Sequence, residues 1–138
     1  MTTGPLLRAL ALAAVGGLAV TIPVACSSDK PAVCSDADSL KAAVSGLGDN
    51  IRGSTNPLDK LSSQVAAVSD SFTQLKTDAK QQFSSQINAM SGAVSGLKDS
   101  VNAAKSNPSA ATIQSVVSDA STTKTAGQSL TSAVKNTC

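Results

Sequence analysis

Apolar residues recur every three or four positions from Leu58 to Ala104, and neither Gly nor Pro interrupts positions 58–91. This spacing places side chains on one face of an α-helix, whereas a half-buried strand would alternate every two residues. The pattern therefore predicts an all-α fold. The apolar series is Leu58, Leu61, Val65, Val68, Phe72, Leu75, Ala79, Phe83, Ile87, Met90, Val94, Leu97, Val101 and Ala104.

Two shorter helices are predicted on either side of this series. For the first, Ser35 is a candidate N-cap with Asp38 in the capping-box position, and Gly53 ends the helix. Asn56-Pro57 and Asn107-Pro108 are candidate starts of the second and third helices, because Pro is favoured at the first helical position. The apolar residues expected to face inward in the short helices are Leu40, Val44, Leu47, Ile51, Ile113, Val116, Val117, Ala120, Leu130 and Val134.

The arrangement of these helices has two solutions. Around Ala79–Ile87 a step of four follows another step of four, which is a coiled-coil stutter. The uninterrupted pattern favours one long helix of roughly 73 Å, with helices of roughly 27 and 45 Å folded back along it. That would be an elongated antiparallel rod. The alternative is a compact four-helix bundle, in which the long helix breaks near Gln81–Ser85.

One stretch of the third helix has few large apolar residues. Residues 121–128, STTKTAGQ, are mostly small and polar. Because little apolar surface is available there for burial, we expect this stretch to pack loosely or to fray.

Residues 1–25 have the pattern of a secretory signal. Arg8 precedes twelve apolar or small residues at 9–20, and small residues follow before Cys26. A membrane-spanning helix needs about 20 apolar residues, and the segment from Leu6 to Ala25 barely reaches that length with Pro23 inside it. An uncleaved anchor is therefore the second interpretation.

The end of this segment, Ile22-Pro23-Val24-Ala25-Cys26-Ser27, resembles the lipobox of bacterial lipoproteins. In that family the cysteine is diacylated and becomes the mature N-terminus, although the family usually has an aliphatic residue where Pro23 stands. The resemblance implies lipidation of Cys26, a short tether over 26–33 and a helical domain over 34–138. The protein would be anchored to the outer face of the cell membrane. The alternative is an unlipidated, secreted protein with an ordinary Cys26.

Cys34 and Cys138 are the candidate disulfide pair. Disulfides persist in the oxidising compartment that an exported protein reaches. The two short helices together are about as long as the long one. Folded back along it in the rod, they would bring Cys34, near the start of the first helix, and Cys138, at the end of the third, together beside the stutter. A competing pair, Cys26–Cys34, would leave Cys138 free.

Composition argues against several classes of function. Without residues 1–25 there are ten basic and nine acidic residues (11 − 1 = 10), so the net charge is +1 and gives no electrostatic case for nucleic acid. The chain has no Glu, His, Trp or Tyr, which leaves few groups for acid–base catalysis or metal binding. Ser121 and Lys124 match an SxxK motif, but its companion motifs are missing. We expect no enzyme activity, no cofactor and no metal.

Four parts of the chain set its layout: Val24–Ser28, Val33–Lys41, Asn107–Ile113 and Cys138. This layout resembles that of the small Ala/Ser-rich helical lipoproteins of actinobacterial envelopes. The resemblance implies a location and a fold, and no activity. We therefore expect a non-enzymatic envelope lipoprotein with a structural or protein-interaction role and an envelope protein as partner. The alternative is a module that binds a small apolar ligand between helices, lined by Phe72, Phe83, Ile87 and Met90.

Overall fold

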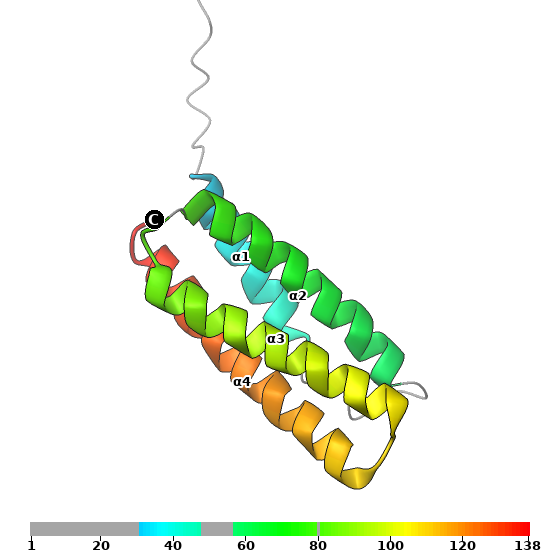
Figure 1. Cartoon of the computed structure of the whole chain (residues 1–138). Helices are drawn as coiled ribbons and strands as arrows, with labels where there is room; N and C mark the ends of the chain where they lie inside the picture. Colours follow the sequence, from blue (N-terminus) through cyan, green and yellow to red (C-terminus); the bar gives the residue numbers. More distant parts are fainter. Residues whose placement is uncertain (1–30, 48–56, 80) are drawn as a thin grey trace, which may run out of the picture.

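The computed structural model describes residues 31–47, 57–79 and 81–138, and this part of the chain is all-helical. The helices are α1 (Ala32–Ser45), α2 (Pro57–Ala79), α3 (Ser84–Ser106) and α4 (Ala110–Lys135). Each helix packs against two others, in the ring α1–α2–α3–α4–α1. Neighbours in this ring run antiparallel, and the start of α1 lies at the same end as the C-terminus (Figure 1). These contacts fit a four-helix bundle.

The prediction of one helix through residues 58–104 is wrong. Helix α2 ends at Ala79, a turn follows, and α3 begins at Ser84, so the break falls where the stutter lies and where the bundle alternative had placed it. Phe83 occupies the N-cap position of α3 and is buried. A helix is held mainly by burial of its apolar face. The chain reversal lets α2 and α3 bury their apolar faces against each other. This burial favours the break even though no Gly or Pro interrupts the sequence there.

The predicted apolar faces are confirmed within the described residues. Leu58 is partly buried, and every other member of the series from Leu61 to Ala104 is buried. Leu40, Val44, Leu47, Val116, Ala120, Leu130 and Val134 also belong to the core. Val117 is an exception, because 44% of its surface is exposed.

The predicted start of the first helix is also wrong. Helix α1 begins at Ala32 after Pro31, so Ser35 lies inside the helix and the predicted tether is helical at its last two residues. Pro31 is the N-cap residue, and its carbonyl accepts a hydrogen bond from the Cys34 amide at 2.8 Å. The predicted continuation beyond Leu47, including Ile51 and Gly53, lies outside the described residues.

The start of α4 has a different cap from the predicted one. Ser109, not Asn107, is the N-cap, and its Oγ accepts a hydrogen bond from the Thr112 amide at 3.2 Å. Thr112 Oγ1 accepts one from the Ser109 amide at 2.9 Å, which completes a capping box. The helix consequently begins two residues later than Pro108. At the start of α2, by contrast, Pro57 is the first helical residue as predicted.

The middle of α4 packs tightly, contrary to the prediction that residues 121–128 are loose. Thr123 is fully buried, and its Oγ1 donates a hydrogen bond to the Ala93 carbonyl of α3 at 3.1 Å. A Cβ added to Gly127 would lie 2.7 Å from Val44 Cγ1 of α1. Small residues let the neighbouring helices approach closely here, so the segment is held without large side chains.

Among the described residues, no helix is both long and apolar enough to cross a membrane.

Candidate functional site

The first candidate site is the bundle end where Cys34 and Cys138 meet. The two cysteines form a disulfide with Cα atoms 6.1 Å apart, across a sequence separation of 104 residues. Cys34 is buried in α1, whereas Cys138 is exposed beyond the end of α4. The predicted partners are therefore together.

Several other predicted features belong to the part of the chain before α1. The leader 1–25, the lipidation candidate Cys26 and tether residues 27–30 lie outside the described residues. Because α1 starts at Ala32, only five residues, 27–31, lie between Cys26 and the helix, which makes six Cα–Cα steps. At about 3.3–3.6 Å per residue, that segment can span roughly 20 Å at most.

Polar contacts near the disulfide join α1 to its neighbours. Lys135 Nζ of α4 lies 2.7 Å from Asp38 Oδ1 of α1, and both side chains are about half exposed. Asp36 of α1 faces Asp78 in the last turn of α2. Burial of the Asp36 carboxyl raises its pKa, and a hydrogen bond with Asp78 and repulsion by that carboxylate raise it further. Asp36 Oδ2 is buried and has no hydrogen-bond partner among the described residues.

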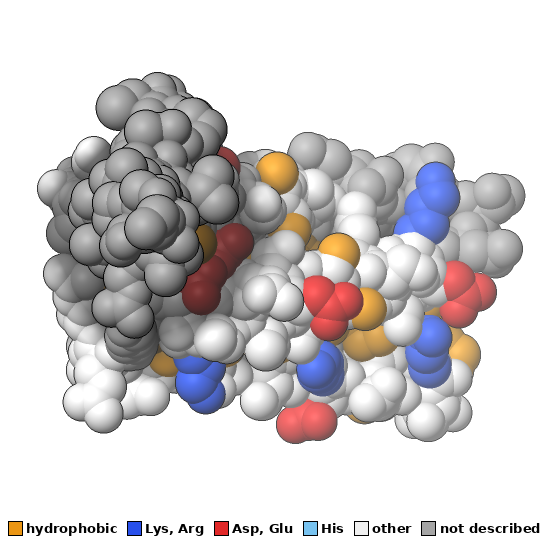
Figure 2. Space-filling view, turned by 90° about the horizontal axis from the view of Figure 1, so that it is seen from above, with side chains coloured by type: hydrophobic (Ala, Val, Ile, Leu, Met, Phe, Trp, Pro, Cys, Tyr) orange, Lys and Arg blue, Asp and Glu red, His pale blue; other side chains and the backbone are white. Residues whose placement is uncertain are grey.

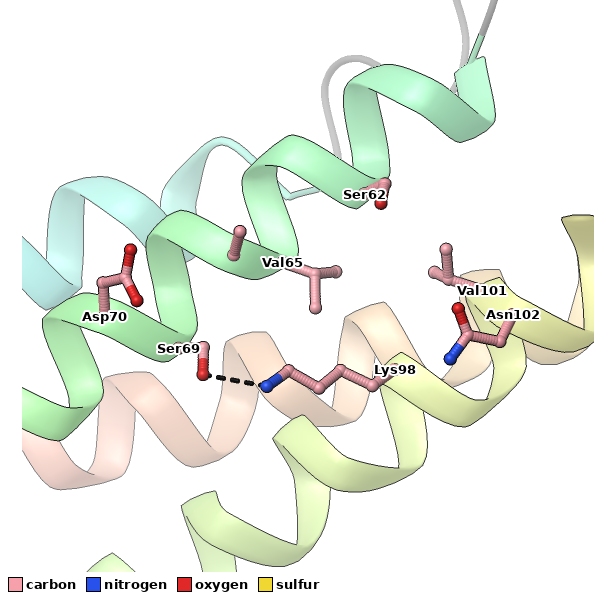
Figure 3. A pocket seen from close by; sticks show the side chains of 8 residues that line it. Ser62, Val65, Ser69, Asp70, Lys98, Val101 and Asn102 are labelled. Carbon is pink, nitrogen blue, oxygen red and sulfur yellow. Dashed lines mark hydrogen bonds between the residues drawn. The ribbon is translucent and has the colours of Figure 1, made fainter.

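The second candidate site is a groove of about 330 Å³ between α2 and α3. Val65 and Val101 form its apolar floor, and Asn102 stands on the α3 side (Figure 3). Lys98 extends from α3 across the groove and donates a hydrogen bond from Nζ to Ser69 Oγ of α2 at 3.0 Å. The remaining lining residues are Ser62, Ala66 and Asp70.

The groove offers recognition chemistry rather than reaction chemistry. A narrow apolar floor with a lysine, a carboxylate and an amide at its rim can bind a protein segment of mixed polarity. Nothing in the sequence spacing indicated this groove, since Ser62, Ser69 and Asn102 look like ordinary solvated helix positions. The signal that could have found it is the broken helix, because only the reversal after Ala79 brings α2 against α3.

The rest of the visible surface is lightly charged. Figure 2 shows mostly uncharged polar side chains and backbone, with scattered lysines and aspartates and small apolar patches among them. Within residues 31–47, 57–79 and 81–138, no group of three or more His, Cys, Asp or Glu side chains could hold a metal ion.

The predicted lining of an apolar-ligand site lies in the core instead. Phe72, Phe83, Ile87 and Met90 are all buried and belong to the same hydrophobic cluster. A ligand between them would have to displace packed side chains, and close-packed interiors resist such a change. These residues therefore explain stability more directly than binding.

Comparison with known proteins gave no match to a family model, a curated protein or a solved structure.

Proposed function

We propose that this protein is a non-enzymatic lipoprotein of the cell envelope that acts by binding another envelope protein. The mature chain would begin at a diacylated Cys26 and be anchored to the outer face of the cell membrane. The observation that carries the location is the disulfide between Cys34 and Cys138, because such bonds persist mainly in oxidising, extracytoplasmic compartments. The signal-like residues 1–25 support the same conclusion.

An interaction role is the best supported role for the folded part. The groove between α2 and α3 combines an apolar floor with polar groups at its rim, a mixture typical of protein-interaction surfaces. The short segment between Cys26 and α1 would hold the bundle within roughly 20 Å of the lipid headgroups. An anchored bundle of this kind would present the groove to proteins in the same envelope layer.

Site-specific photo-crosslinking in the native envelope tests this role. A photoreactive residue is placed at Asn102, on the groove, or at Gln128, an exposed position of α4 outside it. We expect a single adduct of constant mass from position 102 and none from position 128. The same adducts at both positions, or no adduct at either position, would contradict the proposal that a partner protein binds in the groove.

Two matched substitutions on α2 sharpen the experiment. Ala66 lines the groove and Ala67, also exposed, is absent from the lining residues. Ala66→Glu places a long charged side chain at the groove and should abolish the position-102 adduct. Ala67→Glu adds the same charge and should leave the adduct unchanged. Equal effects would indicate that a general charge effect, and not the groove, controls crosslinking.

A further inference from the structure

Helix α1 is the element of the bundle with the least support of its own. It has 14 residues, whereas α2, α3 and α4 have 23, 23 and 26. Isolated helices of about 12–15 residues or fewer are marginal in water, so α1 depends on its neighbours to stay helical. It packs against α2 and α4, and it is first in chain order among the described helices.

The polar contacts at the start of α1 are weak or unfavourable, and its apolar packing there comes from Ala37 and Leu40, which are fully buried. The Asp38–Lys135 ion pair is half exposed, and exposed ion pairs add little stability. Asp36 lies against the Asp78 carboxyl with a buried oxygen that has no hydrogen-bond partner in the described part of the chain. Farther along, Val44 fits against Gly127, and Gln64 Nε2 donates to the Gly46 carbonyl at 3.0 Å. The disulfide is thus the covalent tie that reinforces this apolar packing at the first turn of α1.

The remaining helices form a connected unit without α1. Helices α2, α3 and α4 follow one another through short turns, and α3 packs most extensively against α4. Thr123 bonds to the Ala93 carbonyl across that interface, and Ser100 bonds to Asp119. Helix α2 is joined to α3 by the Lys98–Ser69 hydrogen bond and by the Lys105–Asp59 ion pair of 3.5 Å. None of these contacts involves α1.

We propose that the Cys34–Cys138 disulfide is a redox-controlled clamp on α1. When it is reduced, α1 leaves the bundle while α2, α3 and α4 stay folded, and the apolar channel between α2 and α4 opens. The inference goes beyond the proposed binding role and does not depend on it. Local opening of this kind is expected of the least stable cooperative unit of a protein.

The chemistry is thiol–disulfide exchange with a dithiol reductant. Its thiolate attacks Sγ of Cys138, the exposed partner, and forms a mixed disulfide while Cys34 leaves as a thiolate. The second thiol of the reductant then displaces Cys138 and closes its own disulfide. Two electrons and two protons pass to the protein, which ends with two cysteine thiols, and the reductant ends oxidised.

Hydrogen exchange of the full chain, with and without a dithiol reductant, tests the clamp. We expect amides of residues 32–45 to exchange at least about 100-fold faster after reduction, because the cross-link no longer limits the open state. Amides of α2, α3 and α4 should stay protected. Equal loss of protection in all helices, unchanged protection of α1, or loss of most helical circular dichroism on reduction would each overturn the proposal.

Two variants separate the clamp from other effects. Cys34→Ala should show fast exchange of α1 without reductant, no further change on adding it, and increased binding of an apolar fluorescent dye. Lys135→Gln removes the ion pair but keeps the disulfide, so α1 should remain protected until reductant is added. If Lys135→Gln released α1 as fully as Cys34→Ala, the ion pair and not the disulfide would be the clamp.

Discussion

Gly127 shows how a single small residue fixes the position of α1. A Cβ at this position would lie 2.7 Å from Val44 Cγ1 and 3.2 Å from Val44 Cγ2. Contacts below 3.0 Å force a neighbour to move, and Val44 is a fully buried, β-branched side chain with little freedom. The close approach of α1 to α4 therefore requires glycine here.

We predict that Gly127→Ala destabilises the protein by about 1–3 kcal/mol, the usual range for overpacking a core. The free energy of unfolding from urea titration measures the effect. Gly92 is the matched control, because it is also helical but has open space around an added Cβ. Gly92→Ala should stabilise the protein by up to about 1 kcal/mol through helix propensity. Stabilisation by both substitutions would show that α1 is not packed on Gly127.

Asp36 makes the stability of the protein depend on pH. Because its pKa is raised in the folded state, its contribution to stability is fully present below its unfolded pKa of about 3.9 and is lost as the pH rises through the folded value. Asp36→Asn removes this ionisation. The variant should therefore gain stability relative to the natural protein as the pH rises from 4 toward 7.

Denaturant titrations at several pH values measure this difference. Ser39→Ala, at an exposed position on α1, changes no ionisable group, so it serves as the control and should leave the pH profile of stability unchanged. A stability difference between Asp36→Asn and the natural protein that stays constant with pH would contradict the buried position of this carboxyl.

At the scale of the element, the capping box fixes where α4 begins. Ser109 and Thr112 satisfy each other's backbone amides, and loss of such a cap typically costs about 1 kcal/mol. We predict that Ser109→Ala lowers the free energy of unfolding by that amount. Ser121→Ala, at an exposed position inside α4, should not lower it. Equal losses would indicate that the cap contributes nothing specific.

The helix faces were predictable from the sequence because burial follows the three-and-four spacing directly. Leu61, Phe72, Met90 and Leu97 are buried as that spacing requires. The break after Ala79 was not predictable in the same way, since it comes from packing of α2 on α3 and not from a local breaker. The stutter lies at the position of the break, but its spacing is compatible with both a continuous helix and a chain reversal.

The buried polar residues of α4 were missed for a related reason. In the sequence, Thr123 and Gly127 belong to a stretch with little apolar surface to bury. Their contribution to stability depends on which helix lies opposite them. Only the placement of Ala93 and Val44 gives them partners. The α2–α3 groove was missed because its lining comes from two segments that the sequence pattern joined into one helix.

At the scale of the whole molecule, the bundle predicts a compact particle. A chain of about 113 residues with this packing should have a radius of gyration near 13 Å, whereas a rod built on a helix of roughly 73 Å would exceed about 20 Å. Small-angle scattering of the processed protein distinguishes the two. A value near that of the rod would contradict the reversal between α2 and α3.

We propose that this chain is exported, anchored through a lipid on Cys26 and folded as a bundle that a disulfide closes. Intact mass of the protein from its native host, followed by unreduced peptide mapping, tests it most directly. We predict loss of residues 1–25, the added mass of acyl chains on Cys26, and a linked peptide pair containing Cys34 and Cys138. An uncleaved chain with three free thiols, or a Cys26–Cys34 peptide, would contradict the account.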